Sequence, residues 1–475
     1  MDGLLNIMRW RTMHQVSGRF GYRLRRGFCR LRLWRVAHIP DKPFMFILAT
    51  VVGLMAGTGA YLLKGLVRVM STFLTRSFDG REMNYWLLAL PVVGILIVSA
   101  YMRFVLKRDI SHGVSKLMAG MRKGIYSLGS YVMYSPILAG AVTLSFGGSA
   151  GSEGPIAYAG AGMGSNVGKL FKVDTRMLMI LVGCGAGAGI AGIFKAPVGG
   201  ALFALEILRV DFTVVSVLAL VVSTLVSALT AYVLSGCTMD VSFLQSQPFD
   251  ASVLPFLLLL GVFCGLYSMY YNYVMKLMEA LLRRMTNRWV RCLFAGGVLA
   301  VLLFLFPVLY GEGYNTIGHV INGDFAKLAD GGIFMFVDSE AYVLLLTGLG
   351  IIICKSCATA MTVSGGGVAG DFAPTLFAGC IAGFVFAYFM NVAFGTHLPV
   401  SDFAYYGMAG AMAGVIRAPL MAIFLTAEMA GAYSSILPLT IVCALSFGVV
   451  RLITFDGYYS RHIDRKNGLL NRAAK

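Results

Sequence analysis

Gly151-Ser-Glu-Gly-Pro155 has a counterpart 219 residues later in Gly370-Asp-Phe-Ala-Pro374. Further along, Gly192-Ile-Phe-Lys-Ala-Pro-Val198 returns 222 residues later as Gly414-Val-Ile-Arg-Ala-Pro-Leu420. Both pairs lie in the same order along the chain, so the sequence contains two related halves. Interrupted, glycine-rich segments at corresponding places in two halves are typical of transporters, whose binding site lies where the repeats meet.

The composition places these halves in a membrane. Hydrophobic residues make up 58% of the 475 residues, charged residues make up 13%, and the mean hydropathy is +0.78. A soluble domain carries about 25% charged residues, so the spare apolar surface here is expected to face lipid. This excludes a soluble enzyme, a nucleic-acid-binding protein and a disordered scaffold.

The apolar runs predict helices that are partly broken. A perpendicular span needs about 20 residues, whereas runs such as 131–146 and 403–416 are shorter, and others are interrupted by glycine or proline. We therefore predict an all-α polytopic membrane protein with tilted, partly broken or re-entrant helices.

The charge distribution predicts the topology. The net charge is +17, with nine arginines between Arg9 and Arg35 and a basic cluster at 461–475. Under the positive-inside rule both termini are cytoplasmic. The predicted divisions are a basic amphipathic helix on anionic headgroups at 1–42, membrane repeats at 43–235 and 236–460, and a basic cytoplasmic tail at 461–475. The lipid-facing residues of the first helix would be Trp10, Phe20, Leu24, Leu31 and Trp34.

The two glycine-rich loops, 147–155 and 364–374, are predicted to present backbone N–H groups to a ligand. Glycine lets the backbone approach closely, and proline near a helix start occupies a position that needs no N–H. A helix beginning there points free N–H groups and the positive end of its dipole forward. Two such starts would bind an anion without a fixed full charge, which suits an ion that must leave again.

Glu153 is a carboxylate among glycine and proline in an apolar chain, where an acid is costly and by default functional. We predict that its carboxylate competes with the permeant anion for the same N–H groups, and that protonation releases it. The alternative is a helix cap that satisfies first-turn N–H groups. Asp371 is its partner in the second half, where the capping role is favoured.

At these residues the chain resembles the CLC family of chloride channels and chloride/proton antiporters, over roughly 111–460, in its bacterial form without cytoplasmic CBS domains. The resemblance implies inverted halves, a homodimer with one pore per subunit, the bacterial inner membrane, and Glu153 as the external gate. It implies chloride, and in the antiporters protons, as the transported ligands, with no cofactor. The anion-binding residues that it implies are Ser111, His112, Gly154, Asp371, Phe372, Ala373 and Tyr459, with Tyr458 as the alternative to Tyr459.

Two positions depart from the family pattern. Ser111-His-Gly-Val-Ser115 stands where the family has G-S-G-I-P, which puts His112 at the central serine. An imidazole N–H can still donate to an anion, and Ser111 or Ser115 is the alternative donor. The family's internal proton-transfer glutamate aligns with Ile207, which cannot carry a proton. Chloride/proton exchange and passive chloride conduction therefore both stay open.

Two other classes of function are weighed against anion transport. An intramembrane hydrolase would use Ser149 or Ser152 with His112, but a serine nucleophile needs a base within reach and an oxyanion hole. A cation transporter would use Glu153 and Asp371 as ligands, and would be expected to carry more carboxylates. We expect a transporter that is not an enzyme.

Overall fold

The computed structural model describes residues 38–75, 86–237, 250–330, 333 and 340–473, with side chains described as far as Thr454 in the last helix. Its described secondary structure is helical apart from one isolated β-bridge, as predicted. The helices of the first half are α2 (Asp41–Thr75), α3 (Trp86–Ala100), η1 (Tyr101–Leu106), α4 (Gly113–Arg122), η2 (Ser130–Met133), α5 (Ser135–Ser145), α6 (Glu153–Phe171), α7 (Thr175–Phe194), α8 (Pro197–Leu202), η3 (Phe203–Ile207) and α9 (Val214–Leu234).

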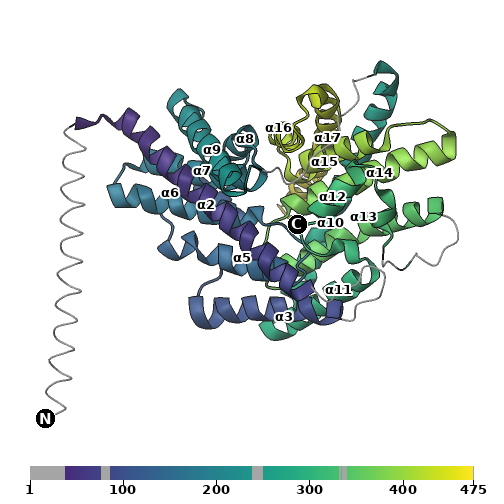
Figure 1. The fold of residues 1–475 in the computed structure, drawn as a ribbon, viewed down its shortest axis with the longest axis horizontal. Helices are drawn as coiled ribbons and strands as arrows, with labels where there is room; N and C mark the ends of the chain where they lie inside the picture. Colours follow the sequence, from purple (N-terminus) through teal and green to yellow (C-terminus); the bar gives the residue numbers. More distant parts are fainter. Residues whose placement is uncertain (1–37, 76–85, 238–249, 331–332, 334–339, 474–475) are drawn as a thin grey trace, which may run out of the picture.

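The second half follows the gap at 238–249. Its helices are η4 (Ala251–Val253), α10 (Leu254–Arg283), α11 (Arg288–Leu305), η5 (Pro307–Leu309), α12 (Tyr314–Ile321), η6 (Phe325–Leu328), α13 (Glu340–Gly365), α14 (Phe372–Phe394), α15 (Val400–Ile416), α16 (Pro419–Ala430), η7 (Tyr433–Ser435) and α17 (Ile436–Ala473). In Figure 1 the two halves lie on opposite sides of the molecule, with α3 beside α11 where they meet.

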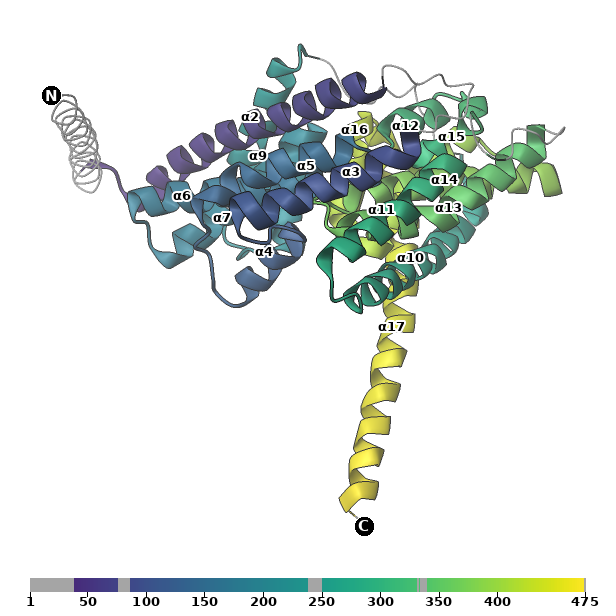
Figure 2. The ribbon, with the colours of Figure 1, turned by 90° about the horizontal axis from the view of Figure 1, so that it is seen from below.

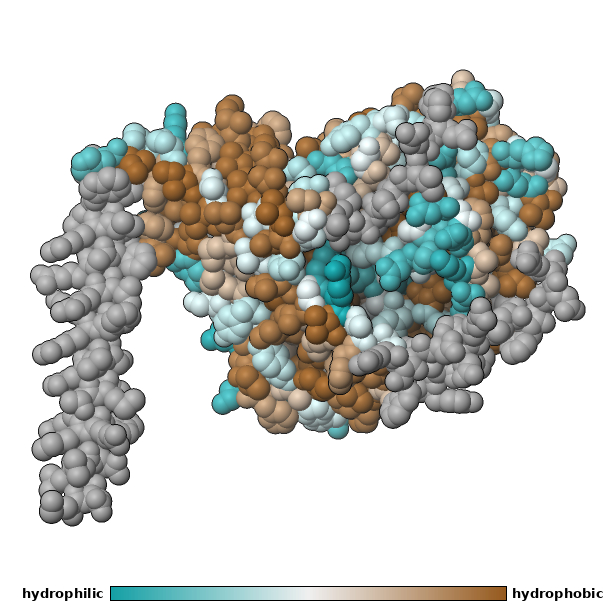
Figure 3. Space-filling view, viewed as in Figure 1, coloured by the Kyte–Doolittle hydropathy of each residue, from teal (hydrophilic) through white to brown (hydrophobic). Residues whose placement is uncertain are grey.

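The hydropathy of the helices fits a polytopic membrane protein. Nine helices in the described part of the chain are long and apolar enough to span a bilayer. The shorter apolar helices 135–145, 197–207 and 419–430 confirm the prediction of partly broken helices. Large apolar side chains on α2 and α9 are exposed, among them Leu62 and Leu229, and Figure 3 shows apolar residues covering the flanks of the molecule.

Glycines bring the helices of each half into close contact. Gly160 of α6 faces the carbonyl of Gly185 in α7, so that a Cβ on either would overlap the other's backbone. Gly379 of α14 and Gly407 of α15 repeat this arrangement in the second half. Small residues at matching places are a usual means by which membrane helices pack without side chains between them. The same contact in both halves supports the repeat read from the sequence.

The Lys/Arg-Ala-Pro motifs turn the chain between two helices in each half. Lys195 directly follows α7 and Arg417 directly follows α15, both in the left-handed conformation with φ of 55° and 63°. Proline then begins α8 and α16 at a position that needs no N–H. The turn after each motif therefore folds alike in both halves. The stretch that leads to Glu206 is divided between α8 and the π-helix η3, whereas the stretch that leads to Glu428 is the single helix α16.

Glu206 and Glu428 tie the two halves together reciprocally. The carboxylate of Glu206 accepts the backbone N–H of Met421 at 2.9 Å, at the start of α16. The carboxylate of Glu428 accepts the backbone N–H of Gly199 at 2.8 Å, at the start of α8. Each glutamate thus caps the short helix of the other half, which gives the pair a structural role.

One face of the molecule carries a cluster of arginines. Figure 2 places α12 on one face, and the α10–α11 turn and the C-terminal part of α17 on the other. The α10–α11 turn carries Arg283, Arg284 and Arg288. We call the α12 face the outer side and the opposite face the inner side. α17 continues as one helix to Ala473, so the described part of the predicted basic tail is helical.

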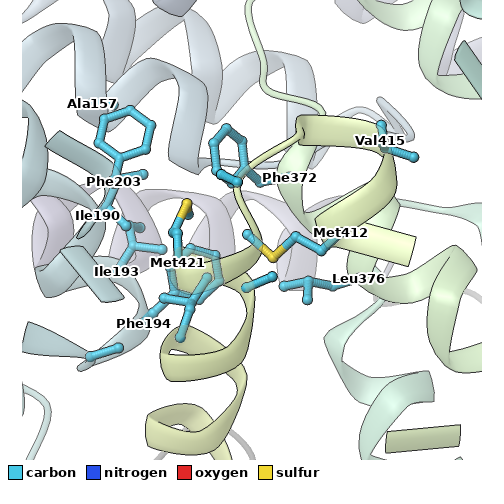
Figure 4. Close-up of a cluster of buried hydrophobic side chains, with 14 of the residues drawn as sticks. Ala157, Ile190, Ile193, Phe194, Phe203, Phe372, Leu376, Met412, Val415 and Met421 are labelled. Atoms are coloured by element: carbon cyan, nitrogen blue, oxygen red, sulfur yellow. The ribbon is translucent and has the colours of Figure 1, made fainter. Parts of the chain in front are cut away.

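An apolar cluster fills the junction of the halves (Figure 4). Phe203 of the first half lies against Phe372 of the second, with ring centroids 5.6 Å apart. Ile190 and Met421, also from different halves, are fully buried. The junction beside the glycine-rich loops is therefore packed with apolar side chains, and polar contact there depends on the backbone and a few buried polar groups.

Candidate functional site

The two glycine-rich loops lie side by side at the centre of the molecule. The N–H of Gly151 donates to the carbonyl of Gly370 at 2.9 Å, and the N–H of Gly370 donates to the carbonyl of Gly151 at 2.7 Å. This reciprocal pair is the hydrogen-bonded pairing of antiparallel strands, reduced to a single bridge. The loops that the sequence singles out therefore meet, as predicted for a site at the repeat interface.

Two threonines brace the loops across the same axis. The N–H of Ser149 donates to the hydroxyl oxygen of Thr362 at 3.1 Å, and the N–H of Val368 donates to that of Thr143 at 3.0 Å. Each threonine carbonyl also accepts an N–H from its own loop. These threonines were not among the predicted site residues, although they are 219 residues apart, which is the spacing of the loops.

The Glu153 carboxylate crosses from one half to the other. Glu153 begins α6 and is completely buried. Its Oε1 accepts the backbone N–H of Ala373, the second residue of α14, at 2.9 Å. Its Oε2 has no hydrogen-bond partner among the described residues. The carboxylate thus lies at the N-terminus of α14, where free N–H groups and the helix dipole favour a negative charge.

The pairing of the loops corrects the role expected for Asp371. Because Gly151 pairs with Gly370, Asp371 matches Ser152, and Phe372 matches Glu153. The Asp371 side chain is exposed and makes no capping hydrogen bond to α14, so the predicted cap is wrong. It is Glu153 that bonds to the first turn of that helix. The ring of Phe372 is buried and carries no hydrogen-bond donor. The group that this residue can offer to an anion is therefore its backbone N–H.

Two charged residues that were not among the predicted site residues lie near Glu153. Glu312 accepts the backbone N–H of Ser152 at 2.7 Å, immediately before α6. Lys355, on α13, is completely buried, and its Nζ donates to the Ser149 hydroxyl at 2.9 Å and lies 4.6 Å from the centre of the Phe377 ring. A lone basic residue within an apolar helix was the available signal for Lys355, since such residues are rarely without function in a membrane.

On the inner side, His112 and Ser111 line a polar cavity of about 280 Å³. His112 precedes α4 in the left-handed conformation, with φ of 53°. The Ser111 hydroxyl donates to Asp109 at 2.6 Å, so it is engaged by a carboxylate. Burial lowers the pKa of the His112 imidazole below its usual value, which favours the neutral form at neutral pH. The other lining residues are Met102, Asp109, Glu279, Leu282, Arg283, Arg288, Arg291, Val363, Ser364 and Gly366.

Of the remaining predicted positions, one has a described side chain and the others do not. Ile207 is half-buried at the end of η3, where its side chain offers no proton-carrying group. Tyr459 lies on α17 beyond the described side chains, so its predicted contact with the anion stays a prediction. The helix predicted at 1–42 likewise lies outside the described residues, except where α2 begins at Asp41.

The geometry disfavours the two other classes of function. The Ser149 hydroxyl accepts from Lys355 and is buried, whereas His112 lines the inner cavity. Asp371 and Glu153 do not converge with a third ligand, because no group of three or more acidic, histidine or cysteine residues that could hold a metal occurs among the described residues. Where the two loops meet, the available groups are the N-termini of α6 and α14 and backbone N–H groups.

Comparison with known proteins gives matches along most of the chain. The profile of the family described as voltage gated chloride channel matches residues 93–451. The H(+)/Cl(-) exchange transporter ClcA of Vibrio cholerae serotype O1 is 29% identical over 445 residues, which are 89% of this chain and 90% of that protein.

Two solved structures are similar in fold. The crystal structure of a slow cyanobacterial Cl-/H+ antiporter has a TM-score of 0.73 at 23% identity, covering 90% of this chain and 100% of that one. The crystal structure of a CLC-type fluoride/proton antiporter has a TM-score of 0.69 at 22% identity, covering 86% of this chain and 95% of that one.

Proposed function

The chain belongs to the voltage-gated chloride channel family, and from this premise we propose that it carries chloride across the membrane past a gate made by Glu153. The observation that carries the proposal is the 2.9 Å hydrogen bond from the N–H of Ala373 to the Glu153 carboxylate. The carboxylate therefore lies at the start of α14, where a halide would bind the same N–H donors. Anion and carboxylate then exclude each other, and protonation of Glu153 favours the anion.

Energetics support a removable gate. A hydrogen bond to a charged group contributes about 1.5–3 kcal/mol, which corresponds to an occupancy change of roughly tenfold to a hundredfold. A bond of that size holds the carboxylate in place and still breaks rapidly. Neutralising the carboxylate removes its charge-assisted bond to α14. The gate therefore opens when a proton arrives and closes when the proton leaves.

We assign the anion path to backbone donors at the centre and to side chains at the inner mouth. Gly154, Asp371, Phe372 and Ala373 supply N–H groups at the starts of α6 and α14. Ser111 and His112 lie at the inner mouth, with Tyr459 as the assigned inner hydroxyl. The inner cavity is lined by three arginines, which attract anions towards its entrance.

Proton coupling follows from the gate, and we favour chloride/proton exchange. A ClcA relative at 29% identity is an exchange transporter by name. The observation that favours passive chloride conduction instead is Ile207, because an apolar side chain takes the place of the family's inner proton carrier. If the protein exchanges chloride for protons, the inner half of the proton route uses another group or water.

We further propose the assembly and orientation that the family implies. The protein is a homodimer with one pore in each subunit, in the bacterial inner membrane. The two repeats span 43–235 and 236–460, and both termini lie in the cytoplasm. The arginines of the α10–α11 turn support this orientation, since basic loops remain on the cytoplasmic side.

Reconstituted protein tests the function. Liposomes loaded with chloride and diluted into low chloride are followed with a chloride electrode and a pH electrode. An exchanger drives protons against their gradient as chloride leaves, and the protons stop when chloride is replaced by an impermeant anion. Chloride release without proton movement would support passive conduction. Release of cations without chloride would contradict the proposal.

A further inference from the structure

We propose that Glu312 is the outer proton-transfer residue, which exchanges protons with the outer solution and passes them to Glu153. This inference rests on the proposed function and adds a residue to its outer half. Glu312 stands just before α12, the helix that Figure 2 places on the outer side. It is half-buried, whereas Glu153 is completely buried. An acid between the surface and a closed gate is suited to carry protons inward.

The loop geometry holds Glu312 over the gate. Gly311 and Gly313 flank it with φ of 69° and 85°, a left-handed conformation that other residues rarely adopt. A Cβ on Gly313 would lie 2.5 Å from the Phe377 ring, so the loop also approaches α14 closely. These turns bring the Glu312 carboxylate to the N–H of Ser152, the residue before Glu153.

Two buried polar atoms in this region lack a partner, and one of them belongs to the Glu153 carboxylate itself. The Ser152 hydroxyl and the Glu153 Oε2 are inaccessible to solvent and make no hydrogen bond among the described residues. Buried polar atoms are normally satisfied, so this pair marks a place where a proton or a mobile polar group is received. In the transfer, the Glu312 carboxyl gives up its proton, the Ser152 hydroxyl accepts one and releases its own, and Glu153 becomes protonated.

The charges around Glu312 suit this role. Lys355 of α13 is completely buried, and its Nζ donates to the Ser149 hydroxyl, three residues before the Ser152 N–H that Glu312 accepts. On the outer surface, Lys64 of α2 lies 5.9 Å from the centre of the Tyr314 ring on α12. Hydrophilic residues gather over α12 in the middle of this face (Figure 3).

The competing role for Glu312 is a structural cap of α6. The two roles separate by substitution, because glutamine keeps an oxygen that accepts the Ser152 N–H but carries no proton. Glu312→Gln therefore preserves the cap and removes proton transfer, whereas Glu312→Ala removes both. Asp324→Asn is the matched control, because Asp324 is an outer-side carboxylate between α12 and η6 that pairs with Lys327 at 3.4 Å.

The test is chloride flux from liposomes after a step in outer pH, measured by stopped flow with a chloride-sensitive dye. Wild type and Asp324→Asn should accelerate rapidly as the outer pH falls. Glu312→Gln should respond at least about tenfold more slowly, since a positioned proton-transfer group typically contributes more than that. In a Glu153→Gln background the same change should have no effect on flux.

Equal responses of Glu312→Gln and wild type would overturn the proposal, and so would a slow response of Glu312→Ala alone, which would establish the cap. Failure of the underlying function looks different, because wild type itself would then show no response to outer pH. A slow Glu312→Gln in the Glu153→Gln background would also overturn the proposal, since it would mean that Glu312 acts on the anion directly.

Discussion

The two glycine-rich loops share a backbone and differ in their side chains. Each loop donates to the other through Gly151 or Gly370, and each is braced by a threonine from the opposite half. The side chains break the symmetry, because Glu153 of the first loop is matched by Phe372 of the second. In the proposed function, the symmetric backbone builds an anion site and the one asymmetric carboxylate gates it.

Glu153→Gln removes the asymmetric charge and should have the largest effect. The neutral amide no longer makes a charge-assisted bond to the N–H of Ala373, so chloride should compete roughly tenfold to a hundredfold better for that place. Chloride flux should rise and lose its dependence on outer pH. Liposome flux across a pH series measures both. A variant that keeps the wild-type pH profile would show that another group is the gate.

Gly370→Ala breaks the symmetric backbone instead. A Cβ at Gly370 would lie 2.6 Å from the backbone nitrogen of Gly154 and 2.7 Å from the Glu153 carboxylate oxygen. Such overpacking costs about 1–3 kcal/mol, so we expect a lower melting temperature in detergent and most of the transport lost. Gly297→Ala on α11 is the control, because a Cβ there meets open space. Equal stability of both variants would mean that the loops are not closely paired.

His112→Ser tests whether the inner mouth contributes selectivity that the loop backbones do not. The imidazole lines the inner cavity, and replacing it with a hydroxyl should change the preference among chloride, bromide and nitrate by a few-fold, an effect of less than about 1.4 kcal/mol. Competition fluxes measure this series. An unchanged series would place His112 outside the anion path.

Glu206→Ala and Glu428→Ala should have the smallest effects, and similar ones. Each removes a cap from the short helix of the other half, which costs about 0.5–2 kcal/mol. Thermal melts of the two variants should shift down by comparable amounts, while the ratio of protons to chloride stays at the wild-type value. A changed ratio in Glu206→Ala alone would give that residue a part in the proton route.

The sequence predicted the features that a repeat makes visible. Matching motifs identified both loops, since each has a counterpart at a fixed spacing, and Glu153 stood out as an acid among glycine and proline. The role of Asp371 was wrong, because an acid before a helix predicts a local cap, whereas here the first turn of α14 bonds to Glu153 from the other half. Tertiary pairing overrode the local preference.

Residues without a counterpart were not predictable in the same way. Glu312 reaches α6 from a loop 160 residues away, and Lys355 reaches Ser149 from 206 residues away. Neither belongs to a repeated motif, and their contacts depend on how α12 and α13 pack over the loops. Only the cost of an isolated charge in an apolar helix marked Lys355 in advance.

Bromide diffraction tests most directly whether Glu153 and the transported anion compete for one place. Crystals of wild type and Glu153→Gln grown in bromide would be compared at the bromine absorption edge. The account predicts a strong anomalous peak beside the N–H of Ala373 in Glu153→Gln, and a weak peak or none there in wild type at high pH. Equal peaks in both proteins, or no bromide at the start of α14 in the variant, would contradict it.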